Sequence, residues 1–237
     1  MILERFRLDD KVAIITGAGR GIGAGIALAY AEAGAHVVCA ARTREQVEAT
    51  AQEARRHGHR ALGLVCDVNE RPQLEELVRQ TMHDFGRIDI LVNNAGGWPP
   101  QPALETSERT FEQALRFNVT TAFLLTRLTV PHMLQGAGGS IVNISSAAGR
   151  LVMAGFVAYG TAKAALSFMT RQLAAELAPE VRVNALAVGA VHTSALAPFL
   201  TDELRARMEA IGGKSVTPII GGVRAANRKS SVQLRKK

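Results

Sequence analysis

The sequence predicts an α/β fold in which helices cover both faces of a parallel, doubly wound sheet. Short runs rich in Val, Ile and Leu alternate along the chain with longer amphipathic stretches. These runs are apolar at most positions, which is typical of strands buried on both faces of a parallel sheet. From residue 11 the order is strand, helix, strand, helix, strand, so a Rossmann-type sheet is the natural closure.

The elements follow one another without an internal repeat. Six strands are expected, in KVAIIT (11–16), AHVVCAA (35–41), ALGLVCDV (61–68), RIDILVNNAG (87–96), SIVNISS (140–146) and VRVNALAVG (181–189). Helices are expected at 22–34, 43–58, 72–86, about 107–134 and roughly 156–178. The second of these carries a solvent-facing pattern and ends at a glycine.

The chain is expected to form one domain over residues 1–211, followed by a basic, loosely ordered tail over 212–237. No linker precedes residue 211, whereas the segment beyond has glycine pairs and no sustained period. Seven of the 28 basic residues lie in the last 24, and no acidic residue lies there. The body is therefore formally neutral, which argues against a nucleic-acid partner. We interpret the charged residues of the tail as solvated and without a binding role, since no aromatic residues accompany them.

The N-terminal sequence, the lengths of the apolar runs and the placement of the cysteines argue for a cytoplasmic protein with no membrane partner. The N-terminal MILERFRLDD is charged and has no apolar core like that of a secretory signal. No apolar run approaches the ~18 residues that a membrane span needs. Cys39 and Cys66 lie in or beside apolar strands, and we expect two reduced, buried thiols with no disulfide and no metal site.

A glycine-rich turn, TGAGRGIG (16–23), follows the first strand and opens a helix. Gly17, Gly21 and Gly23 allow a tight turn and a close approach of backbone amides to a pyrophosphate at the helix N-terminus. The plain alternative is a glycine-rich connection with no ligand. The position of the glycine-rich turn directly after the first strand favours a nucleotide-binding site.

The end of the second strand indicates which dinucleotide is preferred. An NAD site of this type has an acidic residue about 20 positions on, which binds the ribose 2′-hydroxyl. Here Ala41 is followed by Arg42, and Arg20 lies inside the glycine turn. Two cations would attract a 2′-phosphate, so we expect NADP(H) to be preferred, with NAD(H) possible. The alternative is that both arginines are only solvated surface residues.

A tyrosine and a lysine stand at i and i+4 in the stretch VAYGTAKAAL (157–166). On a helix, Tyr159 and Lys163 share a face, and a nearby cation is expected to lower the pKa of the phenol. The hydroxyl could then exchange protons with an alcohol or carbonyl. Ser146, 13 residues earlier at the end of a strand, could bind the same oxygen. Each alone could be coincidence or a helix cap, but their joint spacing behind a nucleotide turn favours a catalytic set.

These motifs together resemble the short-chain dehydrogenases/reductases. The resemblance covers residues 10 to about 200 and rests on TGAGRGIG, the pair Asp67-Val68, NNAG (93–96), Asn118 in LRFNVT, and NISS with YGTAK. It is highly specific for the family and much less so for any substrate.

The resemblance implies a role for each matching residue. Tyr159 would be the acid–base, Ser146 the partner of the substrate oxygen, Lys163 a ligand of the nicotinamide ribose, and Asn118 the holder of a water in a proton relay. Asp67 would contact adenine and Asn93 would line the nucleotide cleft. The implied cofactor-binding set is Gly17, Arg20, Gly21, Ile22, Gly23, Arg42, Asp67, Val68, Asn94, Ala95, Gly96, Tyr159, Lys163, Gly189 and Thr193. Without the family, intrahelical or helix-start hydrogen bonds would explain Asp67 and Asn118 equally well.

The C-terminal part departs from the family pattern. Val188-Gly189 stands where the family usually has Pro-Gly, and the helix and seventh strand expected beyond position 210 are not recognisable. A homodimer or homotetramer is implied by the resemblance, weakened if the chain is truncated there.

The predicted function is an oxidoreductase that interconverts a carbonyl and a secondary alcohol. Trp98, Met153, Phe156, Leu196 and Phe199 lie in segments that the family uses to surround its substrate, and they indicate an apolar pocket. Ketones, steroid-like rings, 3-oxoacyl thioesters and sugars remain open as substrates. The alternative is a cofactor-binding but catalytically impaired relative that acts through partner proteins.

Overall fold

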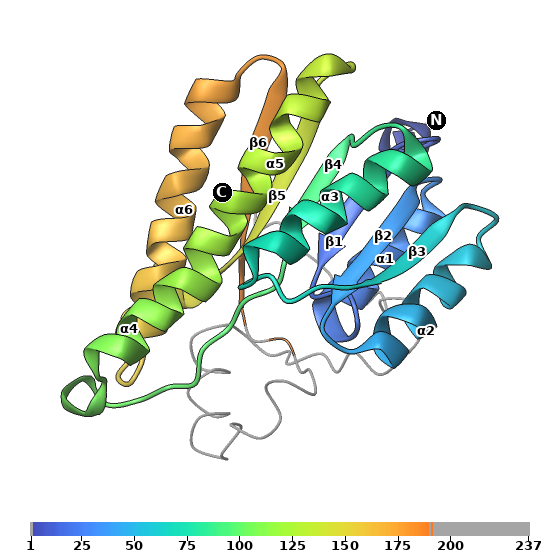
Figure 1. The fold of residues 1–237 in the computed structure, drawn as a ribbon. Coiled ribbons are helices and arrows are strands. Elements are labelled where there is room, and N and C mark those ends of the chain that lie inside the picture. The colour runs from blue at the N-terminus through green and yellow to red at the C-terminus, as the bar shows by residue number, and fades with distance from the viewer. Residues whose placement is uncertain (1, 190, 192–237) are drawn as a thin grey trace, which may run out of the picture.

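A six-stranded parallel sheet forms the centre of the computed structural model, which describes residues 2–189 and 191 (Figure 1). The strand order is β3-β2-β1-β4-β5-β6. The strands are β1 Val12–Thr16, β2 His36–Ala41, β3 Ala61–Val65, β4 Ile90–Asn93, β5 Gly139–Ser146 and β6 Val181–Val188. The order reverses between β1 and β4, and ligands of such sheets bind at the carboxyl ends of the strands beside this point.

Helices connect successive strands. They are α1 Gly21–Glu32, α2 Arg44–Arg55, α3 Arg71–Phe85, α4 Glu108–Leu115, α5 Thr121–Gln135 and α6 Val157–Leu177. Short 3₁₀ turns cover Ile2–Phe6, Ala103–Glu105 and Ala147–Gly149, and a π-helical turn covers Arg116–Thr120. The predicted doubly wound fold with six strands is thus confirmed for the described residues.

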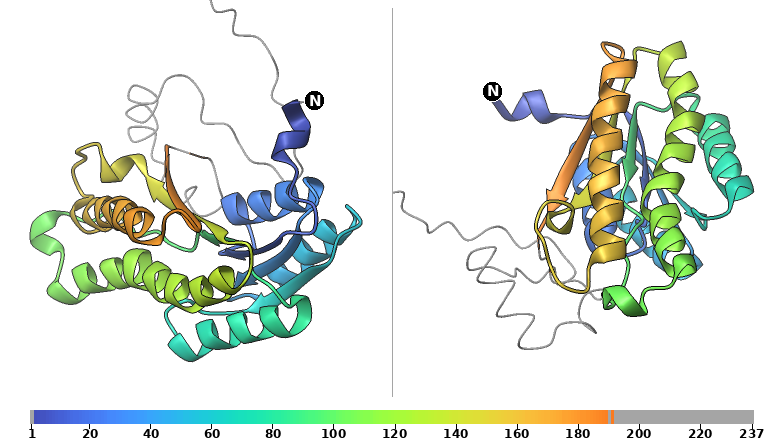
Figure 2. Two further views of the ribbon diagram at one scale, coloured as in Figure 1. Left: turned by 90° about the horizontal axis from the view of Figure 1, so that it is seen from above. Right: turned by 90° about the vertical axis from the view of Figure 1, so that its left-hand side faces the viewer.

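The helices form two layers, one on each face of the sheet (Figure 2). Ile14, Leu91 and Ile141 point to the face covered by α3, α5 and α6. Their chain neighbours Ile15 and Val92 point to the face covered by α1 and α2. β1, β2 and β4 therefore bury both of their faces, which explains why their sequences are apolar without alternation. The strand β6 alternates instead, with Val181 and Val183 buried and Arg182 and Asn184 exposed.

Two boundaries differ from the sequence prediction in an informative way. The single helix expected over about 107–134 is divided into α4 and α5 by the π-helical turn, which inserts extra backbone at Asn118. The strand expected over 87–96 pairs only at Ile90–Asn93. Asp89 precedes it and accepts a hydrogen bond from Val12 N at 2.9 Å, so the chain there is fixed by a side chain.

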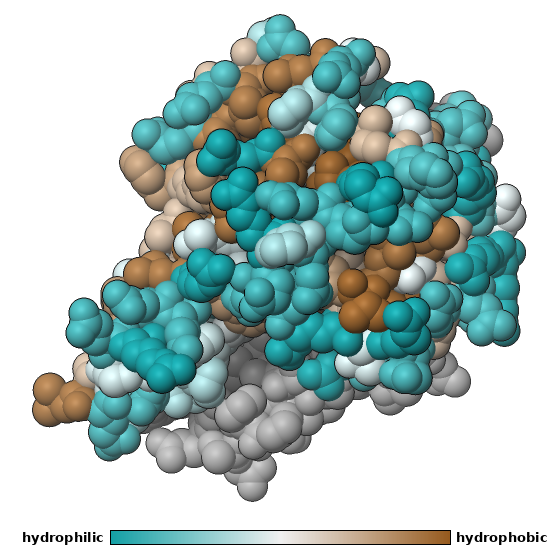
Figure 3. All heavy atoms as spheres, in the orientation of Figure 1, coloured by the Kyte–Doolittle hydropathy of each residue, from teal (hydrophilic) through white to brown (hydrophobic). Residues whose placement is uncertain are grey.

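Both cysteines are buried, free thiols, as expected. Burial raises the pKa of Cys39 to about 12 and that of Cys66 to about 11. None of the described helices combines the length and apolar character that crossing a membrane requires. The face in Figure 3 is mainly hydrophilic and carries separate apolar patches. The predicted domain end near residue 211 and the basic tail lie outside the described residues.

Candidate active site

The glycine turn has the backbone shape that a phosphate-binding loop needs. Gly17 and Gly21 adopt φ angles of +66° and +58°, where residues with a Cβ are strained. Gly23 tolerates no side chain, because a Cβ there would lie 2.3 Å from Gly17 O. The helix α1 begins at Gly21, so its first backbone N–H groups open toward the turn. This local geometry fits a dinucleotide pyrophosphate.

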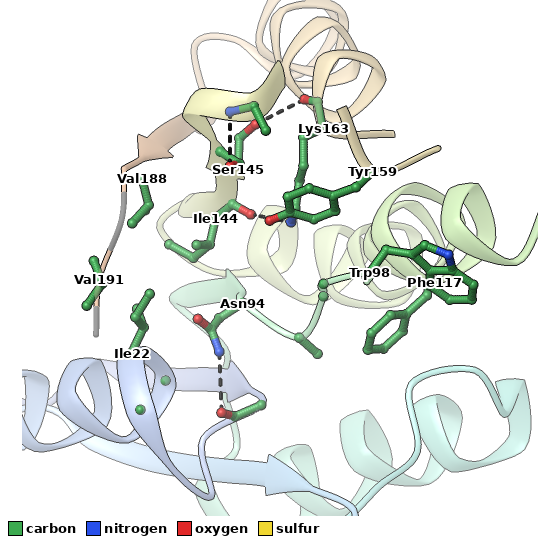
Figure 4. A pocket seen from close by; sticks show the side chains of 18 of the residues that line it. Ile22, Asn94, Trp98, Phe117, Ile144, Ser145, Tyr159, Lys163, Val188 and Val191 are labelled. Carbon is green, nitrogen blue, oxygen red and sulfur yellow. Dashed lines mark hydrogen bonds between the residues drawn. The ribbon is translucent and has the colours of Figure 1, made fainter. Parts of the chain in front are cut away.

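Thr16 and Asn94 lock the turn to the neighbouring strand β4. Asn94 Nδ2 donates to Thr16 O at 2.8 Å and to Gly17 O at 3.3 Å (Figure 4). Thr16 Oγ1 in turn accepts from the backbone N–H groups of Asn94 and Ala95, both at 3.0 Å. Thr16 was not predicted. Its signal in the sequence is a hydroxyl residue at the last strand position before the glycines.

A cavity of about 1010 Å³ extends from the glycine turn across the carboxyl ends of the strands. Every predicted cofactor residue within the described part of the chain lines it: Gly17, Arg20, Gly21, Ile22, Gly23, Arg42, Asp67, Val68, Asn94, Ala95, Gly96, Tyr159, Lys163 and Gly189. Ser146 lines it as well. Thr193 lies outside the described residues.

Two described residues that the resemblance implied, Asn118 (described below) and Asn93, do not line the cavity. Asn93 is the last residue of β4. Its side chain is buried in the core, where Asn93 Nδ2 donates to Asn143 Oδ1 at 2.9 Å, and it does not line the cavity. Successive strand residues point to opposite sides, so at the end of β4 only one of two adjacent asparagines can face the turn. That residue is Asn94.

Tyr159, Lys163 and Ser146 meet in the wall of the cavity that is formed by β5 and α6. Lys163 is 3% exposed and its Nζ donates to Ile144 O at 2.8 Å. The same Nζ lies 5.7 Å from the centre of the Tyr159 ring. The hydroxyl of Ser146 lies near enough to the phenol of Tyr159 to lower its pKa, and it accepts from Ala148 N at 3.2 Å. The sequence spacing therefore brings the three groups together as predicted.

The pKa of Tyr159 has the opposite direction from the prediction. Burial raises it above the ordinary value, and the hydroxyl of Ser146 offsets this only in part. Burial also lowers the pKa of Lys163 to about 8. The prediction that the ammonium of Lys163 lowers the pKa of Tyr159 is wrong. Nζ lies near the ring but donates to Ile144 O, and burial disfavours the charged forms of both side chains. At neutral pH Tyr159 is consequently a neutral phenol, able to donate a proton.

Asn118 supports the cavity from the π-helical turn. It is 2% exposed, and its Oδ1 accepts from Gly97 N at 2.8 Å while Nδ2 donates to Gly97 O at 3.1 Å. Nδ2 also donates to Ala114 O at 2.9 Å, the intrahelical bond named above as an alternative. A Cβ at Gly96 would lie 2.8 Å from Asn118 Oδ1 and 2.9 Å from Lys163 Nζ. Glycine at this position therefore leaves room for both polar atoms beside the backbone.

The comparisons with known proteins agree with this geometry. The family described as short chain dehydrogenase matches residues 11–204. The chain belongs to the short-chain dehydrogenase family. An uncharacterized oxidoreductase MT0954 of Mycobacterium tuberculosis (strain CDC 1551 / Oshkosh) is 52% identical over 211 residues, 88% of this chain and 80% of that protein. The 7alpha-hydroxysteroid dehydrogenase of Escherichia coli (strain K12) is 37% identical over 206 residues, 86% of this chain and 80% of that protein. A solved structure of 7 alpha-hydroxysteroid dehydrogenase with NADH and 7-oxo glycochenodeoxycholic acid superposes with a TM-score of 0.84 at 36% identity, covering 87% of this chain and 81% of that one.

In this short-chain dehydrogenase the end of the cavity beside α2, where a bound dinucleotide would place its adenosine, carries two cations and two polar side chains. Arg20 and Arg42 line it together with Thr43 and Gln46, of which the last two were not predicted. Thr43 is the N-cap residue of α2 but makes no side-chain capping bond, so its hydroxyl is not committed to the helix. Asp67 also lines the cavity, and its Oδ1 accepts from Asn69 N at 3.0 Å in the turn before α3. The N-cap of α3 is Glu70, so this bond is not the helix-start bond that the sequence left open.

The opposite end of the cavity is apolar. Two loops build it, and the bond from Gln101 N to Gly155 O at 2.8 Å joins them. Trp98 and Phe117 occupy one side of this region (Figure 4). Met153 and Phe156, both predicted from the sequence, line it too. Leu196 and Phe199 lie outside the described residues.

Proposed function

We propose that this short-chain dehydrogenase is an NADP(H)-preferring carbonyl reductase whose substrate is an uncharged, largely apolar ketone. One observation carries the proposal. Ser146, Tyr159 and Lys163 converge in the same cavity that begins at the glycine turn. A proton donor and a dinucleotide loop facing one enclosed space fit carbonyl–alcohol chemistry.

Each residue of the site would have a separate role in the reaction. A bound nicotinamide dinucleotide supplies or accepts the hydride. The hydroxyls of Ser146 and Tyr159 bind the substrate oxygen, and Tyr159 donates its proton as negative charge develops there. The ordinary pKa of a phenol is near 10 and burial raises that of Tyr159 further, so the residue holds a proton to donate at neutral pH. Lys163, charged below its pKa of about 8, adds a cation beside the phenol and a donor for the cofactor ribose.

The preference for NADP(H) is supported by charge at the adenosine end. Arg20 and Arg42 border this part of the cavity, and the uncommitted hydroxyl of Thr43 stands at the N-terminus of α2. Guanidinium groups and a helix N-terminus are the usual partners of a phosphate. A related 7 alpha-hydroxysteroid dehydrogenase was solved with NADH, so the preference must be measured for this chain itself.

The substrate class is supported by the apolar end of the cavity. Its lining of Trp98, Phe117, Met153 and Phe156 suits a ring system or an acyl chain better than a free sugar. Relatives that act on hydroxysteroids make a steroid-like ketone the first compound to test. We also propose that the protein assembles as a homodimer or homotetramer, which is supported by the exposed side chains of Phe123 on α5 and Phe168 on α6. We propose further that it is cytoplasmic.

The experiment is NADPH oxidation with a panel of steroid ketones, 3-oxoacyl thioesters and keto sugars. We expect at least one apolar ketone to be reduced, with a higher kcat/KM for NADPH than for NADH. Tyr159→Phe should lower kcat by roughly 10²–10⁴-fold, the usual worth of a positioned acid, and leave the Kd of NADPH within about twofold. Turnover that survives in Tyr159→Phe would remove this residue from its role. Binding of NADPH without turnover of any compound would favour the catalytically impaired alternative.

A further inference from the structure

Ser145 precedes Ser146 on β5 and belongs to the wall of the cavity, but its hydroxyl is bonded toward α6. It is 3% exposed. Its Oγ donates to Lys163 O at 3.0 Å (Figure 4). The same Oγ lies 2.7 Å from Ser167 Oγ, which itself bonds to Lys163 O at 2.9 Å. The two hydroxyls and the carbonyl form a triangle, so Ser145 stays tied to this turn of α6 whichever way the hydroxyl hydrogens point.

Three consecutive residues of β5 therefore hold the catalytic turn of α6. Ile144 O accepts from the side chain of Lys163, and Ser145 Oγ donates to the backbone of the same lysine. Ser146 stands beside Tyr159, one helical turn earlier than Lys163, and lowers the pKa of its phenol. The position of α6 along β5 at this point fixes the separation of the two hydroxyls that would bind the substrate oxygen.

A second polar tie joins the same strand and helix farther from the cavity. Asn143 Nδ2 donates to Thr170 Oγ1 at 2.9 Å, and both residues are buried. Neither lines the cavity, and Thr170 lies seven residues beyond Lys163. This pair offers a control for an effect that arises only from general packing of α6 on β5.

We infer that Ser145 is a positioning residue that holds α6 in register with β5 and so sets the distance between the Ser146 and Tyr159 hydroxyls. The inference rests on the proposed function for its effect on turnover. A displacement of about 1 Å between reacting groups costs up to 10²-fold in rate, so even a small slip of α6 would be measurable.

The test compares Ser145→Ala, Ser145→Thr and Thr170→Val in the full chain. Ser145→Ala should lower kcat about tenfold with the KM for NADPH within twofold. Its Tm should fall by only about 2 °C, since Ser167 still satisfies Lys163 O. Ser145→Thr keeps the hydroxyl and should restore most of kcat. Thr170→Val orphans the Asn143 amide and should lower Tm by about 5 °C while kcat changes less than twofold.

A spectroscopic measurement separates this inference from the proposed function. The chain has two tyrosines, so the near-ultraviolet titration of Tyr159 is obtained by subtracting that of Tyr159→Phe. In Ser145→Ala the midpoint should move to higher pH, because the effect of Ser146, which lowers the pKa of Tyr159, is weakened. Thr170→Val should leave the midpoint in place.

Several outcomes would overturn the inference. They are an unchanged midpoint in Ser145→Ala, an unchanged kcat in that variant, or an equal loss of kcat in Thr170→Val. If the unaltered chain reduces no ketone, the proposed function fails, and the titration midpoint alone decides the role of Ser145.

Discussion

Replacing Gly23 by alanine should close the dinucleotide loop without changing any charge or hydrogen-bonding group. The added Cβ would stand 2.3 Å from Gly17 O, 2.5 Å from Asn94 Nδ2 and 2.7 Å from Gly17 C. Two of these atoms belong to the backbone of the glycine turn, and the third belongs to the side chain that locks it to β4. None can rotate away cheaply.

The size of the effect follows from these distances. For the Cβ to reach even a 3.0 Å contact with Gly17 O, the start of α1 must move away from the turn by about 0.7 Å. Overpacking of this kind costs about 1–3 kcal/mol of stability. A displaced phosphate-binding turn should weaken dinucleotide binding by roughly 30–100-fold, or about 2–3 kcal/mol.

Gly25 supplies the matched control, because it lies on the same helix and a Cβ there would meet nothing within 4 Å. Gly25→Ala should raise stability by about 0.5–1 kcal/mol, as alanine does in a helix interior, and keep the Kd. Calorimetric titration with NADPH and with NADH, together with thermal melts, measures both quantities. Equal Kd values for the two variants would refute the assignment of the turn as the pyrophosphate site.

Three further predictions concern charge. Arg42→Ala should lower kcat/KM for NADPH about 10–100-fold and leave that for NADH within twofold, and equal losses would mean that Arg42 does not recognise a 2′-phosphate. With NADPH as the varied substrate, kcat/KM should fall by up to tenfold per pH unit above about pH 8, because the ammonium of Lys163 is lost as the pH rises through its lowered pKa. A profile flat to pH 10 would contradict this. Burial works to raise the pKa of Asp89, but the bonds from Arg87 and Val12 N outweigh it and leave that pKa lowered. Asp89→Asn should therefore cost about 1–3 kcal/mol of unfolding free energy at pH 7, and the difference should shrink as acid protonates the wild-type carboxylate below about pH 4, which urea unfolding at several pH values would measure.

The fold could be predicted because its signals are local. Strands such as Val12–Thr16 are fully buried, so their apolar character is continuous, and the helix at Arg71–Phe85 ends at Gly86 in the left-handed conformation that favours glycine. The π-helical turn could not be predicted. It depends on Asn118 bonding across to Gly97, a contact between residues 21 positions apart that no helical period records.

The sequence predicted which residues form the candidate site, but not the directions of their pKa shifts. The spacing of Ser146, Tyr159 and Lys163 fixes their approach once a helix follows the strand. The sign of the pKa shift of Tyr159 depends on how deeply the pair is buried, which sequence spacing does not encode. Thr16 was missed for a related reason, since its partners Asn94 and Ala95 directly follow β4, which becomes the neighbour of β1 only in the folded sheet.

The same burial sets the charge states of Tyr159 and Lys163. The raised pKa keeps Tyr159 protonated at neutral pH and makes it a weaker acid, so its proton would move to the substrate oxygen only as negative charge develops there. A pKa of about 8 leaves Lys163 mostly charged at pH 7 but not at pH 9, so the cation stands beside the phenol at neutral pH. The polar contacts from Ile144, Ser145 and Ser146 hold both groups in this buried position. In this short-chain dehydrogenase the packing of α6 on β5 therefore holds a protonated phenol beside a buried lysine, as the proposed reduction requires, and the glycine turn is the proposed dinucleotide site of the same cavity.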